Sequence, residues 1–270
     1  YHVDVNSAYL SWTAAYRVCI LGEDLDLRDI PSVIGGSEAE RHGIVLAKSG
    51  SAKRYGIRTG ETLAEARCKC PGLVIVPPDY SLYVSCSKAL VELLKKYFPH
   101  VHQYSIDEAF CRVEGTKGLW GTHTAFAHQL KEEIRRELGF TVNIGVSDCK
   151  LLAKMASEFQ KPDQVHTLFT REIERKMWPL PVSDLFWVGP ATVRKLGALG
   201  IRTIGELAVM DLELLKRHLK KQGEFIWNYA NGRDVSPFLR ELPRNKGYGN
   251  SMTTPFDVTD RETAWQVILS

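Results

Sequence analysis

Two short acidic motifs contain the residues best suited to chemistry. One is Asp4-Val5-Asn6, which follows a short apolar run, and the other is Asp107-Glu108, which lies between two β-like segments. Mg²⁺ prefers hard oxygen ligands and usually takes only a few carboxylates together with substrate phosphates. Two such ions roughly 3.5–4 Å apart can stabilise both the attacking and the leaving oxygen of phosphoryl transfer. Asp4, Asp107 and Glu108 therefore predict a shared site for two magnesium ions.

Geometry limits how these carboxylates can meet. The two motifs are far apart in the chain, so only folding can unite them. Adjacent residues on a flat strand point to opposite faces, so Asp107 and Glu108 can share a site only if the backbone turns between them. Taken alone, an acidic pair at a turn is more often a solvated surface feature than a metal site, and each motif needs support from its context.

The elements that must position these motifs follow from the spacing of apolar residues. The order of strand-like and helix-like segments predicts an α+β fold, with helices on one face of a sheet. Short runs bounded by turn residues predict strands at 1–5, 30–36, 43–48, 73–76, 102–106, 109–113 and 141–146. Helical spacing predicts helices at 8–18, 51–55, 62–70, 81–97, 124–137 and 150–159.

The character of the chain changes beyond Pro179. Residues 185–229 predict short helices only, which are separated by glycines and include a basic run at 216–221. We interpret this part as a separate helical domain. Residues 237–243 predict a linker, and a new segment begins at residue 246.

Composition and charge restrict the class of protein. The chain has 270 residues, of which 44% are hydrophobic, and a formal net charge of +3. This mild excess permits a nucleic-acid partner without demanding one. The six cysteines lack a standard zinc spacing, which favours reduced thiols and a cytoplasmic protein. No apolar run reaches the length of a membrane span, so we expect no membrane partner.

Five motifs, taken in chain order, resemble those of Y-family translesion DNA polymerases. The resemblance is closest to the bacterial polymerase IV and polymerase V catalytic subunits and covers nearly the whole chain. The motifs are H-V-D-V-N-S-A-Y-L-S (2–11), A-K-S-G-S-A-K-R-Y-G-I (47–57), Q-Y-S-I-D-E-A-F (103–110), N-I-G-V-S with K-L-L-A-K-M-A-S and Lys161-Pro162 (143–162), and W-V-G-P-A-T with G-I-R-T-I-G (187–205).

The resemblance implies a domain plan. The expected parts are a palm sheet at 1–8 and 78–169, small inserted fingers at 9–77, an all-helical helix-hairpin-helix thumb at 170–236, a linker at 237–245, and the start of an incomplete little-finger domain at 246–270. Within this last part we expect a strand at 251–258 and a helix from 261. A strand and a helix alone leave too much apolar surface in water, so we expect either a truncated chain or a tail that docks elsewhere.

The resemblance also assigns roles to single residues. Asp4 and Asp107 would bridge both metals, Glu108 would hold the ion that activates the primer 3′-hydroxyl, and the Val5 carbonyl would complete the nucleotide-side ion. The nucleotide-binding candidates are Tyr9 as steric gate against a ribose 2′-hydroxyl, with Lys53, Arg54 and Lys161 on the triphosphate. The DNA-binding candidates in the thumb are Gly189, Thr192, Arg194 and Lys195.

Without this context, Tyr9 is better explained as a core aromatic, and the lysines as exposed surface residues. The activity that the resemblance implies is template-directed DNA synthesis of the low-fidelity, translesion kind used in DNA damage tolerance. Primer-template DNA and deoxynucleoside triphosphates are the implied partners, and a sliding clamp is implied through a C-terminal region outside this chain.

Several positions depart from the usual family pattern. Asn6 stands where many members have a second Asp, and Cys149 stands where Asn is usual. Trp187 replaces the first Gly of the thumb hairpin, where we expect the bulky ring to hinder close backbone approach to phosphate. Two alternatives stay open: a nucleotidyl cyclase, which shares a palm-like sheet and carboxylates, and a DNA-binding accessory protein with a decayed site.

Overall fold

The computed structural model describes residues 1–37, 43–113, 121–234, 247, 249, 251 and 253–269. The chain divides into two compact units. The first comprises Tyr1–Asn6, Ala89–Glu137 and Thr141–Arg240, and the second comprises Ser7–Lys88, Leu138–Phe140 and Glu241–Ser270. Within the described part of the chain, no helix is long and apolar enough to cross a membrane.

The first unit is built on a five-stranded sheet with the order β5-β6-β1-β7-β8. The central strand β1 is antiparallel to both of its neighbours, β5 pairs antiparallel with β6, and β7 pairs parallel with β8. The short edge strand β8 was not expected from the sequence. The strands are β1 (His2–Val5), β5 (His100–Gln103), β6 (Glu108–Arg112), β7 (Val142–Val146) and β8 (Val165–Thr167).

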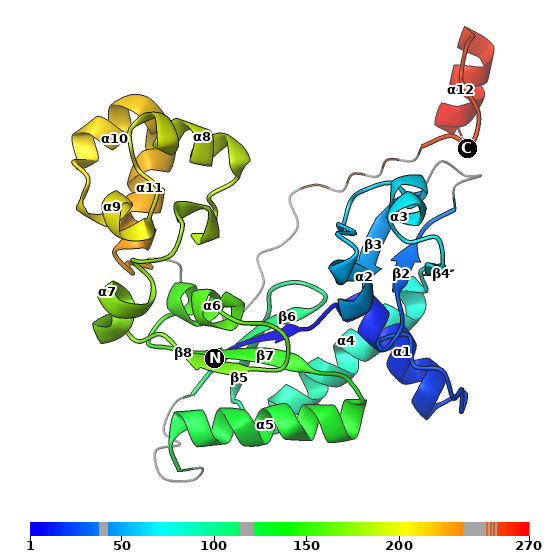
Figure 1. Cartoon of the computed structure of the whole chain (residues 1–270), viewed down its shortest axis with the longest axis horizontal. Helices are drawn as coiled ribbons and strands as arrows, with labels where there is room; N and C mark the ends of the chain where they lie inside the picture. The colour runs from blue at the N-terminus through cyan, green and yellow to red at the C-terminus, as the bar shows by residue number, and fades with distance from the viewer. Residues whose placement is uncertain are drawn as a thin grey trace. The chain divides into compact units, whose positions relative to one another are not determined.

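Helices cover both faces of this sheet. Helix α6 (Lys150–Glu158) lies on one face and α5 (His123–Leu138) on the other (Figure 1). Every residue of β1 and β7 is buried, which is typical of strands covered on both sides. The expectation that helices cover only one face is therefore wrong, while the α+β class is confirmed.

A glycine lets α6 lie close against the sheet. Gly145 is the partner of His2 across the β1–β7 pair. A Cβ atom at Gly145 would come within 1.8 Å of the Ala153 carbonyl oxygen in α6, so any side chain there would push the helix away. This close approach brings the polar residues of α6 over the face of β1 that carries His2 and Asp4.

The turn between β5 and β6 lies earlier than the sequence predicted. The strand expected at 102–106 ends at Gln103, and residues 104–107 form the turn. The Tyr104 and Ser105 amides both donate to the Glu108 carbonyl, at 2.9 and 3.2 Å, and the Asp107 amide donates to Ser105 Oγ. Asp107 thus lies in the turn and Glu108 begins β6, so the backbone turns between the two acidic residues as the shared site required.

Short helices follow the sheet and pack on α6. They are α7 (Ile173–Lys176), α8 (Pro190–Ala198), α9 (Ile204–Val209), α10 (Leu212–Leu219) and α11 (Lys221–Ala230). Leu152 and Met155 of α6 belong to the same hydrophobic cluster as Leu196 of α8 and Ile226 of α11. This shared core makes the short helices and the sheet parts of one unit.

The backbone explains why a glycine is usual at position 187. Trp187 has φ 70°, a left-handed conformation that costs a residue other than glycine roughly 1–2 kcal/mol. Its side chain is 58% exposed and contacts Phe186 and Phe225, with ring centroids 5.4 and 6.3 Å away. The Trp187 carbonyl accepts a hydrogen bond from Gln222 Nε2 at 3.3 Å. These contacts hold the strained residue in place.

The second unit contains a three-stranded sheet with the order β3-β2-β4. Strand β2 (Ser32–Gly35) is antiparallel to β3 (Val45–Lys48) and parallel to β4 (Val74–Val76). Among its helices are α1 (Ala8–Cys19), α2 (Gly50–Arg54), α3 (Leu63–Lys69) and the first part of α4 (Tyr80–Lys95). A reciprocal capping box between Thr62 and Glu65 begins α3, as the polar start of this segment favours.

The last described segment only partly follows the prediction. Helix α12 (Arg261–Leu269) forms where a helix was expected. The strand expected at 251–258 is absent from its described residues, 251 and 253–258. Pro255 interrupts this segment and cannot donate to a strand pair. The linker expected at 237–243 lies outside the described residues.

Candidate active site

Strand pairing brings two of the predicted carboxylates together. Asp4 and Glu108 are direct partners across the antiparallel β1–β6 pair, so their side chains lie on the same face of the sheet. Glu158, the last residue of α6, joins them: one carboxylate oxygen from each of the three lies within 4.8 Å of the others. Asp4 is buried, Glu108 is half-buried and Glu158 is exposed, so the cluster opens to solvent at the Glu158 side.

Glu158 is a site residue that the sequence analysis missed. It precedes Lys161 by three residues, and its carboxylate accepts from Lys161 Nζ at 2.9 Å. The signal available in the sequence was its place at the end of a helix rich in small residues, just before the Lys161-Pro162 motif. This signal is weak, because a Glu three residues from a Lys is common on exposed helices.

Lys161 lies where it can bind an anion next to the carboxylates. Its Nζ donates to Asp4 Oδ2 at 3.0 Å, and its side chain is 33% exposed. Burial raises the pKa of Asp4 to about 7, although Lys161 opposes this shift, and the Glu158 and Glu108 charges add to it. Three carboxylates are paired with two ammonium groups, Lys161 on Asp4 and Glu158 and Lys154 on Glu108. The remaining negative charge and the carboxylate oxygens suit a divalent cation.

A buried histidine nitrogen without a hydrogen-bond partner supports a cation site. His2 is fully buried, and its pKa is held well below the usual value, mainly by burial. Its Nδ1 lies 2.8 Å from Ser157 Oγ, and that hydroxyl donates to the Lys154 carbonyl, so neutral His2 carries its proton on Nδ1. Its Nε2 has no hydrogen-bond partner among the described residues and lies 4.0 Å from Glu108 Oε1. An unused acceptor beside a carboxylate fits a hydrated cation.

Asp107 lies beside this cluster in sequence but is not one of its three members. Its carboxylate accepts a hydrogen bond from Ser105 Oγ at 2.6 Å, within the turn that precedes β6. The Asp107 carbonyl accepts from the Val5 amide at 3.1 Å, so the backbones of these two candidate metal-binding residues are directly linked. The structure therefore brings the Asp4 and Glu108 side chains together on neighbouring strands, and it links Val5 to Asp107, in the turn before β6, through their backbones.

Asn6 has a structural role that explains why it can stand in place of an Asp. Its Nδ2 donates to Asn143 Oδ1 at 3.1 Å, and its Oδ1 accepts from Thr141 Oγ1 and from the Asp163 amide. A carboxylate could accept but could not donate to Asn143. The amide thereby ties β1 to the loop that carries Lys161.

The remaining nucleotide-binding candidates lie in the second unit. The Tyr9 ring is half-buried and stacks on Tyr83, with ring centroids 4.4 Å apart and planes 6° apart. Lys53 and Arg54 are exposed in the last turn of α2, and Arg54 donates to Ser51 Oγ at 3.1 Å. Tyr9 is thus supported by an aromatic cluster, and the two cations are available to an anion.

The DNA-binding candidates gather at the start of α8. Gly189 is the N-cap and Pro190 is the first helical residue, where the missing amide hydrogen costs nothing. Arg194 and Lys195 are exposed along the same helix, and Thr192 is half-buried. The free amides of a helix start and two cations next to it suit contact with phosphate.

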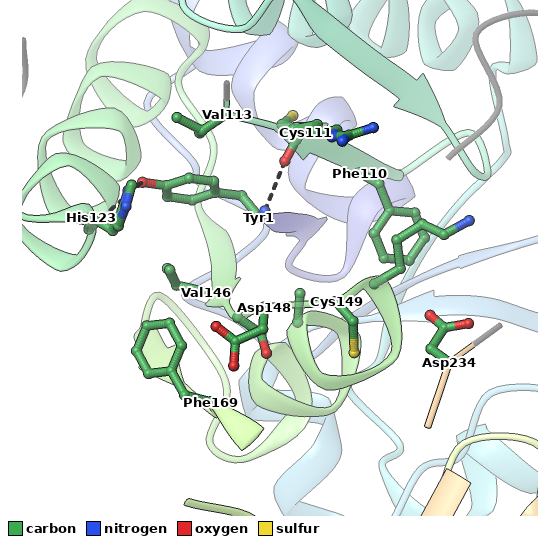
Figure 2. A pocket seen from close by; sticks show the side chains of 14 residues that line it. Tyr1, Phe110, Cys111, Val113, His123, Val146, Asp148, Cys149, Phe169 and Asp234 are labelled. Atoms are coloured by element: carbon green, nitrogen blue, oxygen red, sulfur yellow. Dashed lines mark hydrogen bonds between the residues drawn. The ribbon is translucent and has the colours of Figure 1, made fainter. Parts of the chain in front are cut away.

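A hollow of about 420 Å³ lies elsewhere in the first unit (Figure 2). Asp148, Cys149 and Asp234 are among its lining residues, and none of the candidate metal-binding residues lines it.

The N-cap residue of α6, Cys149, makes no side-chain capping hydrogen bond. Asp234 Oδ2 instead accepts from the Leu151 amide at 2.9 Å, so a residue that follows α11 caps the helix carrying Glu158.

Comparison with known proteins identifies the family. Residues 3–158 match the impB/mucB/samB family. The DNA polymerase IV of Clostridium acetobutylicum is 50% identical over 100% of this chain and 68% of its own length. The DNA polymerase IV of Acetivibrio thermocellus is 41% identical over 97% of this chain and 64% of its own length. The chain thus spans about two thirds of the length of these relatives.

Solved structures agree with the fold. A Y-family DNA polymerase chimera superposes with a TM-score of 0.77 at 21% identity, over 90% of this chain and 70% of the other. DinB from Sulfolobus solfataricus gives a TM-score of 0.76 at 22% identity, over 88% and 68% of the two chains. The chain belongs to the impB/mucB/samB family of Y-family, translesion DNA polymerases. Members of this family use divalent metal ions, which the carboxylate cluster fits.

Proposed function

We propose that this chain carries out template-directed DNA synthesis, of the low-fidelity translesion kind that serves DNA damage tolerance. The observation that carries the proposal is the cross-strand pair of Asp4 and Glu108, with Lys161 Nζ 3.0 Å from Asp4. Carboxylates for metal and a neighbouring ammonium for phosphate are the two groups that nucleotidyl transfer needs together.

Magnesium is the proposed cofactor, with two ions per active site. When bound, the ions would stabilise the attacking and leaving oxygens of the transfer. Asp4 and Asp107 would bind both ions, Glu108 the ion on the primer side, and the Val5 carbonyl the ion on the nucleotide side. In this structure Asp107 Oδ1 accepts a hydrogen bond from the Ser105 hydroxyl at 2.6 Å, which leaves Oδ2 as the oxygen that would bind metal without breaking this bond.

The cationic residues are proposed to hold the triphosphate. Lys161 would exchange Asp4 for a phosphate oxygen when nucleotide binds, since its side chain is already one-third exposed. Lys53 and Arg54 are the residues proposed to bind the triphosphate from the fingers, which are proposed at residues 9–77. Tyr9 would lie beneath the sugar, where its ring, backed by Tyr83, would exclude a 2′-hydroxyl.

The helical part at 170–236 is proposed as the thumb that grips primer-template DNA. Gly189 and Thr192 would contribute the start of α8, and Arg194 and Lys195 would add positive charge to it. Backbone and charge contacts of this kind carry no sequence information, which suits an enzyme that copies any template. A sliding clamp is proposed as a partner of the complete polymerase.

A gel-based extension assay tests this function. The chain is incubated with a labelled primer-template, one deoxynucleoside triphosphate and Mg²⁺, with EDTA as the matched control. We expect addition of the complementary nucleotide only, and only with the divalent ion. Cyclisation of a lone nucleoside triphosphate, or DNA binding without extension, would instead support the cyclase or the accessory protein.

A further inference from the structure

Lys154 is a buried cation beside the proposed metal site. It lies in the middle of α6 and is 7% exposed. Its Nζ lies 2.5 Å from Glu108 Oε1, and the pair is both a hydrogen bond and an ion pair. An ammonium group is costly to bury unless an opposite charge accompanies it. Glu108 provides that charge, so one of its two carboxylate oxygens is already bound to a cation.

Two aromatic rings complete the surroundings of this ammonium group. Lys154 Nζ lies 5.8 Å from the centre of the Tyr104 ring and 5.1 Å from the centre of the Phe186 ring. Both distances fall within the range of a cation–π interaction. Tyr104 belongs to the turn before β6, whereas Phe186 lies just before α8. The Lys154 ammonium group therefore contacts both the β6 side of the proposed metal site, through Glu108 and Tyr104, and the proposed thumb, through Phe186.

The same region has room for the lysine side chain to move. A cavity of about 450 Å³ is lined by Lys154, Glu158 and Phe186, among others. The cavity thus extends from the carboxylate cluster to the start of the helical part. This space adjoins the Lys154 side chain and gives its ammonium group somewhere to move if it releases Glu108.

We propose that Lys154 is a positioning residue that serves as the resting counter-ion of Glu108 and competes with a divalent metal ion for it. Before metal binds, Lys154 neutralises Glu108 and fixes its orientation. While Lys154 holds Oε1, only Oε2 of Glu108 is open to a metal ion, and the charge of Lys154 opposes the binding of that ion. Phe186 stabilises the resting position, so the proposed thumb influences how readily the palm takes up metal. This inference rests on the proposed role of Glu108 as a metal ligand.

The test measures metal binding without catalysis. Mn²⁺ is titrated into the chain in the absence of DNA and nucleotide, and free Mn²⁺ is followed by electron paramagnetic resonance. Lys154→Met keeps the length and apolar stem of the side chain but removes its charge. We expect this variant to bind Mn²⁺ at least about tenfold more tightly, because a unit charge about 4 Å from a cation repels it strongly even at an effective dielectric constant of about 20. Lys154→Arg keeps the charge and should remain close to the parent.

Lys150→Met is the matched control. Lys150 lies one turn earlier on the same helix, about 6 Å along its axis, and its Nζ also lies over an aromatic ring, 5.8 Å from the centre of Phe110. The net charge changes equally in both variants, so a general electrostatic effect would appear in both. Equal Mn²⁺ affinities for the Lys150 and Lys154 variants would overturn the proposal.

A further variant, Phe186→Leu, keeps the proposal testable if Lys154→Met fails to fold. Phe186→Leu changes no charge and touches no carboxylate, yet it removes one ring from the ammonium group. We expect Mn²⁺ binding to tighten about two- to fivefold, the equivalent of one lost cation–π contact. Unchanged binding would contradict the proposed link to the thumb. Asp4→Asn separates the two ideas: if it leaves Mn²⁺ binding intact, the proposed metal site itself is wrong.

Discussion

At the scale of single residues, the candidate site contains ionisable side chains that are buried, and burying a charged group costs free energy. Asp4 is an acid in a buried strand, with a pKa raised to about 7 chiefly by burial and only partly offset by Lys161. Lys154 and His2 are buried on the same face. This cost is offset only where hydrogen bonds and opposite charges accompany the buried group.

The raised pKa of Asp4 predicts how stability depends on pH. The unfolded chain ionises Asp4 near pH 4, whereas the folded chain does so near pH 7, so the folded state holds the extra proton between these values. The free energy of unfolding should therefore fall as the pH rises from 4 to 7. Asp4→Asn removes this dependence and should be more stable than the parent by about 4 kcal/mol at pH 8, since the proton costs about 1.4 kcal/mol for each pH unit between about 4 and 7.

Urea unfolding of both proteins in EDTA, between pH 4 and pH 8, measures this difference. The gap between them should widen up to about pH 7 and then level off. Parallel curves throughout this range would show that Asp4 ionises normally in the fold.

The proposed position of Tyr9 predicts that its ring helps to select deoxyribonucleotides over ribonucleotides. Tyr9→Ala removes the ring that stacks on Tyr83 and opens space below the proposed nucleotide. Ribonucleotide incorporation should rise relative to deoxyribonucleotide incorporation by roughly tenfold or more, since one excluded group is worth about 1–3 kcal/mol. Competing the two nucleotides in single-turnover extension measures the ratio, and an unchanged ratio would reduce Tyr9 to a packing residue.

At the scale of elements, apolar spacing predicted most strands and helices but not the details that build the site. The turn at 104–107 depends on the Ser105 side chain and on two amides sharing one carbonyl, which apolar spacing does not encode. Glu158 reaches the cluster only because Gly145 lets α6 approach the sheet. The sequence did not predict helices on both faces of the sheet. A strand that is covered on both sides usually has a continuous apolar sequence, and β7, although fully buried, contains Asn143 and Gly145.

The start of α6 gives a prediction at this scale. Asp234 caps the helix at the Leu151 amide, a role for which Cys149 has no suitable side chain. Asp234→Ala should lower the free energy of unfolding by about 1 kcal/mol, as loss of a helix cap usually does. Adding Cys149→Asn should restore most of it, because Asn is a strong N-cap. Thermal unfolding measures both variants, and no recovery in the double variant would show that Asp234 acts through other contacts.

At the scale of the whole molecule, the order of motifs identified the family although no single motif did. Asp4, Asp107 and Lys161 are ordinary residues when taken alone, and their succession along the chain carried the inference. The first compact unit is held together by long-range packing, such as the hydrophobic cluster that contains both Leu152 and Leu196. Local sequence patterns do not show which distant residues will pack together in this way.

The salt dependence of DNA binding should show whether the cations of α8, in the proposed thumb, contact phosphates. Each phosphate neutralised by a cation contributes roughly 0.9 to the slope of log affinity against log salt. Arg194→Gln with Lys195→Gln should therefore reduce this slope by up to about 1.8. The matched control replaces Lys95 and Lys96, two exposed lysines at the end of α4. Fluorescence anisotropy on primer-template DNA measures the slopes, and equal changes in both pairs would remove the special role of α8.

The central claim is that Asp4, Asp107 and Glu108 form the catalytic metal site. The most direct measurement is single-turnover addition of one nucleotide to a bound primer, comparing Asp107→Asn with Glu158→Gln. We expect Asp107→Asn to lose roughly a thousandfold or more in rate, the value of several kcal/mol of metal stabilisation, while primer-template binding stays near that of the parent. Glu158→Gln should lose less than about tenfold, a cost below about 1.4 kcal/mol. Parent-like extension by Asp107→Asn, with loss of activity in Glu158→Gln, would contradict this assignment and place the third carboxylate on α6.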